Sequence, residues 1–362
     1  MHLSAKILST VIILLLFATA TLSTVSTNAV LVDCKKNPEE IYFNYDQLTN
    51  LLEQLEQNHS VIFSYQSIGK TYEGRDIWAV KISDNVTIDE DEPEVLFIGG
   101  VHGNEKPGFE SVIYSINSIL QNYSSATINQ TFSNRIREIV DSCELYFMPM
   151  MNPDGVEANS RKNRRPNDCI LGKTLFRGVD INRNSGYKWE EYDKHPFKYS
   201  FVSIFALGIR ANAKYPFFDL GSIKNNGVYR GPYPFSENET KAFKGFIEEH
   251  NITILLDYHT SGEKILYPYS WTTEPAKDED MFVSISENIS NINNFEITQG
   301  SKWYNTFGSP KDWAYDTYGV LPLTIELGER INLKSYDKNY ILDICKTHVL
   351  VNLYAAERAM EL

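Results

Sequence analysis

The chain has 362 residues, of which 42% are hydrophobic and 13% aromatic, so it can bury a large core and lacks the composition of a disordered protein. Its net charge of −13 argues against a nucleic-acid-binding role, because contacts with phosphates require a basic surface. Beyond the N-terminal segment, no stretch is long and apolar enough to span a bilayer.

Residues 1–29 have the pattern of a secretion signal. Lys6 precedes an apolar run from Val11 to Ala18, and small and polar residues follow as far as Ala29. A signal of this kind directs the protein out of the cell and is removed from the mature chain. The tail before Ala29 is longer than usual, so an uncleaved membrane anchor is the alternative. We therefore expect a secreted protein with no membrane contact beyond this segment.

Helix-like and strand-like segments alternate along the rest of the chain. Apolar residues at helical spacing predict helices at Tyr45–His59, Phe109–Tyr123, about 236–251 and about 337–360. A capping box formed by Ser236 and Glu239 supports the start of the third helix. Apolar runs predict strands at Val61–Ile68, Ile77–Ile82, Val95–Gly99, Glu144–Met150, Ile252–Tyr258 and Leu323–Leu327.

Several predicted strands are apolar on both faces, which implies that helices cover both sides of the sheet. The predicted fold class is therefore α/β, with a mixed, mostly parallel central sheet in a single domain over residues 42–362. Residues 30–41 would form a short segment ahead of this domain. From residue 190 to 226 the pattern breaks into an aromatic-rich stretch, which we interpret as an insertion.

The chain has four cysteines, Cys34, Cys143, Cys169 and Cys345. An even number in an oxidising compartment favours two disulfide bonds, and no spacing is that of a CxxC metal site. Sequence alone does not choose among the possible pairings. We favour Cys34–Cys345, which would join the two ends of the chain, with Cys143–Cys169 as the second bond.

The segment EVLFIGGVHGNEKPGFE, Glu94–Glu110, carries the first chemical signal. An apolar run stops at two glycines, and His102 and Glu105 follow three residues apart, which is nearly one helical turn and lets both side chains point the same way. Such nitrogen and oxygen ligands suit Zn²⁺, and a catalytic zinc needs three protein ligands and one open position. His259, just after the apolar run Ile252–Leu256, supplies a third ligand.

Polar side chains also gather where the predicted strands end. The residues at or just past a carboxyl end are His102, Asn152, His259 and Glu326. An open α/β sheet builds its ligand crevice at this edge. We therefore expect these side chains to belong to one site and not to a scattered polar surface.

A series of short motifs resembles one known family. In chain order the motifs are VHGNEKPG, MNPDG, RKNRRPN, GVDINRN, LLDYHT, LYPY, YNTFGSPKDWAY and TIELG. Their order is similar to that of zinc metallocarboxypeptidases of the carboxypeptidase A type, and the similarity extends from about Tyr42 to the C-terminus. The resemblance implies the carboxypeptidase A-like fold, peptidase activity and one Zn²⁺ per chain.

The resemblance also implies roles at the metal. His102, Glu105 and His259 would bind zinc, and Asp180 would support a zinc histidine. Glu326 would be the general base. Peptide hydrolysis needs these residue types, because zinc makes water nucleophilic near neutral pH and a carboxylate must carry the proton to the leaving amine.

Four further residues resemble the substrate-binding residues of the family. Arg161 would stabilise the oxyanion, Asn182 and Arg183 would bind the terminal carboxylate of the substrate, and Tyr304 would close over it. A guanidinium suits both tasks, because it stays charged and its planar fork matches a carboxylate.

Each of these residues has an ordinary structural alternative. The two histidines could be core residues, and Glu326 could be the buried partner of an ion pair. Arg161 could belong to a solvated basic run, and Tyr304 is singled out only by its spacing to Asp312 and Glu326. The functional interpretation is preferred because the motifs occur together.

Two features depart from the family pattern. Members secreted as zymogens carry a prodomain, whereas here only a short segment separates the signal from the domain, so we expect no inhibitory propeptide. The spacing from Glu105 to His259 is also longer than usual, and the insertion at 190–226 accounts for the difference. This insertion either rims the substrate funnel or is an inert surface excursion.

Lys311, in GSPKDWAY, bears on specificity. In the family, the residue before the aspartate of the DW dipeptide lies at the floor of the pocket for the C-terminal side chain. An ammonium there would favour a C-terminal Glu or Asp and repel Lys or Arg, and the nearby Thr306, Ser309 and Ser270 are small and polar, which suits an acidic guest. The alternative is that Lys311 turns to solvent or pairs with a carboxylate, which leaves a neutral pocket.

Together these inferences predict a secreted zinc carboxypeptidase that removes one C-terminal residue at a time from peptides or proteins. One alternative is a zinc amidase of the same fold acting on cell-wall peptides, which the complete set of Asn182, Arg183 and Tyr304 disfavours. The other is an inactive peptide-binding module, which would be expected to have lost a zinc ligand or Glu326. We expect a monomer and no nucleic-acid partner.

Overall fold

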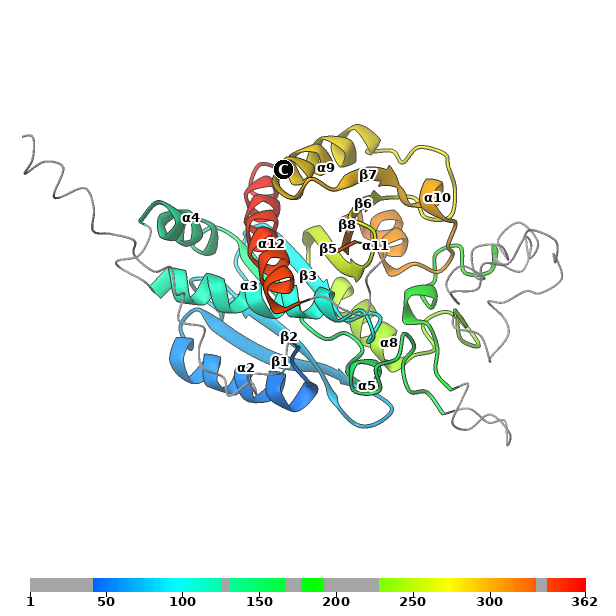
Figure 1. The fold of residues 1–362 in the computed structure, drawn as a ribbon, viewed down its shortest axis with the longest axis horizontal. Coiled ribbons are helices and arrows are strands. Elements are labelled where there is room, and N and C mark those ends of the chain that lie inside the picture. The colour runs from blue at the N-terminus through cyan, green and yellow to red at the C-terminus, as the bar shows by residue number, and fades with distance from the viewer. Residues whose placement is uncertain (1–41, 125–129, 167–176, 192–227, 330–336) are drawn as a thin grey trace, which may run out of the picture. The chain divides into compact units, whose positions relative to one another are not determined.

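A computed structural model describes residues 42–124, 130–166, 177–191, 228–329 and 337–362 (Figure 1). The predicted signal at 1–29, the segment 30–41 and nearly all of the predicted insertion lie outside the described residues. Those assignments therefore stay predictions.

Among the described residues, eight strands form one mixed sheet. In spatial order they are β1 (Phe63–Lys70), β2 (Asp76–Ile82), β4 (Glu144–Met148), β3 (Glu94–Gly99), β5 (Ile252–Thr260), β8 (Leu321–Leu327), β6 (Lys264–Tyr267) and β7 (Glu296–Gln299). The neighbours β4, β3, β5 and β8 run parallel, and the antiparallel pairs flank them on both sides. This confirms the predicted mixed, mostly parallel sheet.

The central strands are apolar on both faces because both faces are covered. Every residue of β3, β4 and β8 is buried. Successive side chains of a strand point to opposite faces, so Leu96 and Ile98 of β3 lie on one side of the sheet and Val95 and Phe97 on the other. A continuous apolar strand is typical of a parallel sheet between two helical layers.

One helical layer centres on α3 (Lys106–Ser124) and α12 (Lys338–Ala359), which pack against β3 and β5. Figure 1 shows these two helices crossing in front of the central strands. The helices α2 (Tyr45–His59), α4 (Gln130–Val140) and α9 (Glu279–Asn293) pack beside β1, α3 and α12 respectively. The predicted helix at Tyr45–His59 is thus confirmed to the residue, with its buried leucines facing the sheet.

The opposite layer is formed by α8 (Asn238–Glu249) and α11 (Pro310–Tyr318). Phe243 and Phe246 of α8 share an apolar cluster with Trp313 of α11 and with Leu96 and Ile98 of β3. The rings of Phe243 and Trp313 meet edge to face, with centroids 5.9 Å apart. Helices therefore cover both faces of the sheet, as the sequence predicts.

The predicted capping box is wrong. The N-cap of α8 is Glu237, and it makes no side-chain capping hydrogen bond. The Ser236 hydroxyl instead donates to the Glu237 carboxylate at 2.6 Å and accepts from the Asn184 side-chain amide at 2.9 Å. Ser236 therefore ties the start of α8 to the segment around Asn184, and the helix begins one residue later than a Ser236 cap would place it.

The two predicted disulfide bonds have different outcomes. Cys143 is a buried free thiol that donates to the Pro93 carbonyl at 3.0 Å, so the predicted Cys143–Cys169 bond is not formed in this structure. Burial raises the pKa of the Cys143 thiol, which keeps it protonated. Cys345 is buried in α12, and because Cys34 lies outside the described residues, the Cys34–Cys345 bond stays a prediction.

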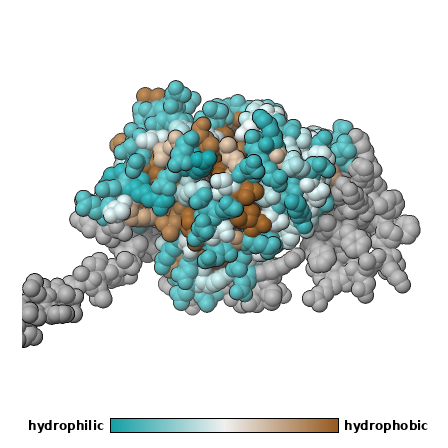
Figure 2. All heavy atoms as spheres, turned by 90° about the horizontal axis from the view of Figure 1, so that it is seen from above, coloured by the Kyte–Doolittle hydropathy of each residue, from teal (hydrophilic) through white to brown (hydrophobic). Residues whose placement is uncertain are grey.

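One face of the molecule is mainly polar. Hydrophilic residues cover most of the face seen in Figure 2, and apolar residues form separate patches among them. Within the described part of the chain, no helix combines the length and the apolar character needed to cross a membrane.

Candidate active site

The strand β3 leads directly into the loop that carries His102 and Glu105. Gly100 has φ +67°, a conformation that favours glycine. Gly103 lies so close to the turn at Gly155 that an added Cβ would be 2.0 Å from the Gly155 carbonyl carbon. The loop therefore depends on two glycines, and its packing against Gly155 fixes both candidate ligands at the carboxyl end of β3.

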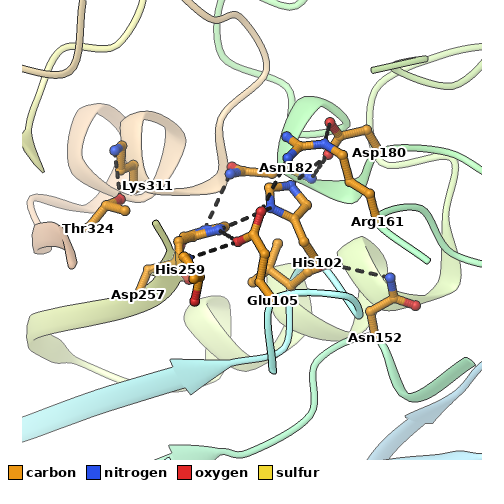
Figure 3. A network of polar contacts seen from close by, with 12 residues as sticks. His102, Glu105, Asn152, Arg161, Asp180, Asn182, Asp257, His259, Lys311 and Thr324 are labelled. Carbon is orange, nitrogen blue, oxygen red and sulfur yellow. Dashed lines mark hydrogen bonds and ion pairs between the residues drawn. The ribbon is translucent and has the colours of Figure 1, made fainter. Parts of the chain in front are cut away.

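Asn152, another residue at a strand end, has a structural role. Its Oδ1 accepts from the Gly155 amide at 2.9 Å and caps α5 (Pro153–Glu157). Its Nδ2 donates to the Val101 carbonyl at 3.3 Å. Figure 3 shows Asn152 beside the loop, apart from the other labelled polar groups. Asn152 supports the His102 loop and does not join the site itself.

Three side chains converge between β3 and β5. Nδ1 of His259 lies 3.1 Å from Nδ1 of His102 and 2.8 Å from Oε2 of Glu105, and Nδ1 of His102 lies 2.8 Å from Oε1 of Glu105 (Figure 3). Both histidines are only 2% exposed. Two neutral rings would place lone pairs against each other at this separation, and a cation between them removes that repulsion. Two imidazoles and a carboxylate are a known donor set of catalytic zinc, so these residues fit the ion.

The other nitrogen of each histidine faces a buried carboxylate. Nε2 of His102 lies 3.1 Å from Oδ1 of Asp180, and Nε2 of His259 lies 2.9 Å from Oδ2 of Asp257. Such an acceptor holds the proton on Nε2 and leaves the lone pair of Nδ1 for a metal. Sequence analysis identified Asp180 but missed Asp257. The available signal was its position two residues before His259, since residues two apart on a strand share a face.

The charges of this cluster are mutually stabilising. Burial alone would lower the pKa of His259, but the carboxylates of Asp257 and Glu105 outweigh burial and raise it well above the usual value. Burial would raise the pKa of Glu105, yet His102 and His259 outweigh it and hold that pKa far below the usual value. The cluster is thus rich in negative charge, which a metal cation can balance in place of a proton.

Arg161 lies against the same cluster. Its Nε donates to Oδ2 of Asp180 at 2.9 Å, and Nη1 donates to Oε1 of Glu105 at 3.3 Å. Burial would lower the pKa of Arg161, but Asp180 and Glu105 outweigh it, so the guanidinium stays charged. The structure therefore holds one fixed positive charge beside the three candidate ligands.

The short 3₁₀ helix η1 (Ile181–Arg183) carries two further predicted residues. Asp180 caps it by accepting from the Asn182 amide at 3.1 Å, and the fully buried Ile181 anchors it in the core. Nδ2 of Asn182 lies 3.4 Å from Nε2 of His259, and Nη1 of Arg183 donates to the Asn182 carbonyl at 2.7 Å. Asp180 thus links the candidate metal ligands to the two residues predicted to bind substrate.

A pocket lies next to the cluster. Its lining residues are Asn182, Arg183, Leu266, Ser270, Gly300, Tyr304, Thr306, Ser309, Lys311, Thr324 and Glu326. Glu326 on β8 is the register partner of His259 on β5, so this carboxylate stands between the pocket and the histidines. The ten predicted site residues therefore form two adjoining groups, one at the candidate ligands and one around the pocket.

Glu326 is only 5% exposed. Burial raises its pKa to about 8; the charge of Glu105 acts in the same direction, whereas His259 and Lys311 oppose it. Burial likewise raises the pKa of Tyr304, and the Glu326 charge adds to this effect. Glu326 therefore has a high proton affinity in the absence of further positive charge, which suits a group that must take up a proton.

Lys311 points into the protein and not to solvent. It is 7% exposed, and its Nζ donates to Oγ1 of Thr324 at 2.6 Å. Burial lowers its pKa, while the charges of Asp312 and of more distant carboxylates oppose that change. The Asp312 carboxylate accepts from the Ser270 amide at 2.8 Å and from its hydroxyl at 3.3 Å. The solvent-directed alternative for Lys311 is therefore wrong in this structure.

The family model for zinc carboxypeptidase matches residues 48–348. A zinc carboxypeptidase from Saccharothrix mutabilis subsp. capreolus is 30% identical over 300 residues, which cover 79% of this chain and 62% of that protein, so the match spans less than two thirds of its length. Carboxypeptidase B from Astacus astacus is 26% identical over 309 residues, covering 80% of this chain and 88% of that protein. The crystal structure of carboxypeptidase A from Helicoverpa armigera has the same fold, with a TM-score of 0.70 at 20% identity, covering 88% of this chain and 73% of that one. The chain belongs to the zinc carboxypeptidase family.

Proposed function

We propose that this protein is a zinc-dependent carboxypeptidase that releases single residues from the C-termini of peptides or proteins. The observation that carries the proposal is the position of Glu326, which lines a pocket containing Arg183 and is also the register partner of the candidate ligand His259. The Glu326 carboxylate, the proposed proton carrier, thus lies between the proposed metal-binding cluster and the proposed carboxylate-binding pocket.

His102, Glu105 and His259 would hold the zinc ion, with Asp180 and Asp257 fixing the two rings. When bound, zinc acts as a Lewis acid that polarises a carbonyl group and makes water more acidic. The pocket begins beside these three ligands, so the side of the metal site that faces the pocket would stay open to substrate.

Two residues would transfer the proton and stabilise the developing negative charge. Glu326 accepts the proton of the attacking water and returns it to the nitrogen of the leaving residue. The Arg161 guanidinium, held in place by Asp180 and Glu105, stabilises the negative charge that develops on the carbonyl oxygen of the scissile bond. Arg161 is suited to this task because it remains charged throughout.

The pocket would recognise a free C-terminus. Arg183 supplies the fork that matches a carboxylate, and Asn182 supplies a neutral donor beside it. Tyr304 lies on the same wall and would cover the bound residue. These three residues restrict the reaction to the last peptide bond of the chain.

The pocket also favours an acidic side chain. Besides Arg183 it contains Lys311, so it presents two cations, and a C-terminal Glu or Asp offers two carboxylates. The Ser309 hydroxyl lines the pocket, is 2% exposed, and has no hydrogen-bond partner within the described residues. A side-chain carboxylate could accept from both Ser309 and Lys311, whereas an apolar side chain would leave both groups desolvated without a partner.

Exopeptidase action can be tested with matched peptides. Peptides with a free C-terminus are expected to be hydrolysed at least 100-fold faster than the same peptides carrying a C-terminal amide, because the amide cannot form a charge-assisted pair with Arg183. The variant Arg183→Ala should raise KM for the peptide with a free C-terminus by about tenfold or more. It should therefore also reduce the ratio between the hydrolysis rates of the free and the amidated peptide. Product analysis by mass spectrometry identifies the bond that is cut. Efficient release from amidated peptides, or cleavage at internal bonds, would contradict the proposal.

The acidic preference can be tested with blocked dipeptides that end in Glu, Asp, Leu, Phe or Lys. The native protein is expected to favour Glu or Asp, and Lys311→Ala should lower the Glu-to-Leu ratio of kcat/KM by about tenfold or more, because a partly buried ion pair is lost. Lys302→Ala provides the control, since Lys302 is an exposed lysine on α10 (Gly300–Trp303) and does not line the pocket. An unchanged Glu-to-Leu ratio in Lys311→Ala, or faster release of Phe or Leu than of Glu, would remove Lys311 from this role.

We also propose that the protein is secreted. The support is the charged start, apolar run and small-residue tail of residues 1–29. Export would expose the protein to extracellular peptides, whose free C-termini are substrates of the proposed kind.

A further inference from the structure

Asp257 on β5 differs from Asp180, the other carboxylate that faces a histidine of the site, in how few hydrogen-bond partners it has. It is 4% exposed, and its Oδ2 lies 2.9 Å from Nε2 of His259. Its Oδ1 has no hydrogen-bond partner among the described residues. Burying a carboxylate costs several kcal/mol unless partners compensate it, so a carboxylate devoted to a single imidazole requires an explanation.

Asp180, the carboxylate that faces the other histidine, has more hydrogen-bond partners than Asp257. Oδ1 of Asp180 faces His102 and accepts from the Asn182 amide, and Oδ2 accepts from Arg161. Asp180 therefore supports a loop, an arginine and a histidine together. Within the described part of the chain, the Asp257 side chain hydrogen-bonds to His259 alone, so its contribution can be separated from the rest of the fold.

The strand pairing explains how the charge of Asp257 is tolerated. Asp257 is the register partner of Thr324 on β8, and the Thr324 hydroxyl accepts from Nζ of Lys311 at 2.6 Å (Figure 3). Lys311 is therefore held at the strand neighbour of Asp257, and the charges of Lys311 and Asp257 act on each other. The charge of Asp257 is thus offset by the His259 ring that it contacts and by the Lys311 ammonium.

We propose that Asp257 is a positioning residue for the metal site: it accepts the Nε2 proton of His259, fixes the ring so that Nδ1 faces the ion, and is itself balanced from the pocket by Lys311. This inference rests on the proposed function, because it takes His259 to be a zinc ligand. Its consequence is that a buried carboxylate outside the pocket lining and outside the three ligands determines how tightly the metal is held.

The test measures zinc binding and does not depend on turnover. Zinc dissociation constants are obtained by competition with a chromophoric chelator for the native protein, Asp257→Asn and Asp257→Ser. Loss of such a carboxylate partner typically weakens metal binding by about 10–100-fold, and we expect that range for both variants. Asp76→Asn is the control, because Asp76 pairs with Lys70 at the start of β2, and its dissociation constant should stay within about threefold of the native value.

A second measurement separates positioning from general loss of structure. In the cobalt-substituted protein, the visible absorption bands report the ligand geometry, so they should shift in Asp257→Asn and remain unchanged in Asp76→Asn. If Asp257→Asn fails to fold, the smaller Asp257→Ser carries the same comparison. Zinc binding within threefold of native in the folded Asp257 variants, with unchanged cobalt bands, would overturn this inference. Failure of the native protein to bind zinc would instead overturn the proposed function.

Discussion

Replacing Glu326 by Gln is expected to lower kcat by about 10²–10⁴ while leaving zinc bound. Glutamine has nearly the same shape but cannot accept a proton from water and deliver it to the leaving amine. Glu326 is not among the three ligand residues that converge on one point, so the metal should remain. Substrate binding should change little, because Arg183 and Asn182 are untouched.

The measurement pairs steady-state kinetics on a blocked dipeptide with the zinc content of the same sample. Glu296→Gln is a suitable control, because Glu296 is a largely exposed carboxylate at the start of β7, outside the pocket lining. Full activity of Glu326→Gln with zinc bound would show that another group is the base. A loss of zinc in parallel with activity would show that Glu326 supports the metal site.

The central part of the fold could be predicted because its sequence signals are strong. A long run of leucines at helical spacing marks α2, and strands buried on both faces stand out as apolar runs, as in β3 and β5. The strands β6 and β7 were missed because each has only four residues, and β7 also begins at the exposed Glu296. Segments this short are held by their neighbours in the sheet, and local periodicity does not reveal them.

The helices α9 and α11 were missed for a different reason. The α11 segment PKDWAYDTY was interpreted as a chemical motif, although Pro310 at the first position and Gly319 at the C-terminal end are ordinary helix signals. The helix α9 mixes buried Phe282, Ile285 and Ile289 with serines and asparagines, although these apolar residues recur at helical spacing. Helix signals were therefore present in both segments.

The motifs hold residue types at fixed spacing, and the structure brings the predicted site residues into two adjoining groups, while their roles stay predictions. What could not be read from the motifs is the pairing between distant segments. The hydrogen bond from Lys311 to Thr324, and the position of Asp257 beside Thr324, exist only because β5 and β8 are neighbours in register. A sequence gives Asp257 and Thr324 without indicating that the sheet will place Asp257 next to Thr324, which lines the pocket.

Removing the metal with a chelator is expected to abolish activity, with a decrease of at least about 10³-fold, because the Lewis acid contributes several kcal/mol to stabilising the transition state. One equivalent of Zn²⁺ per chain should restore the activity of the native protein. His102→Ala should not recover under the same conditions, since only Glu105 and His259 of the converging set remain. A buried histidine outside the site, His348, gives the matched control: its ring faces the Ile344 carbonyl in α12, and His348→Gln should retain zinc-dependent activity if it folds.

The same titration has a readout that needs no substrate. A ligand that binds only the folded state stabilises it by about 4 kcal/mol when present at 1,000 times its dissociation constant, so zinc should raise the unfolding temperature of the metal-free native protein. His102→Ala should show a much smaller rise, whereas Glu326→Gln should show the full one, because the proposed base is not a ligand. Activity that survives verified metal removal, or an unfolding temperature that zinc leaves unchanged in the native protein, would contradict the assignment of His102, Glu105 and His259 as the metal site.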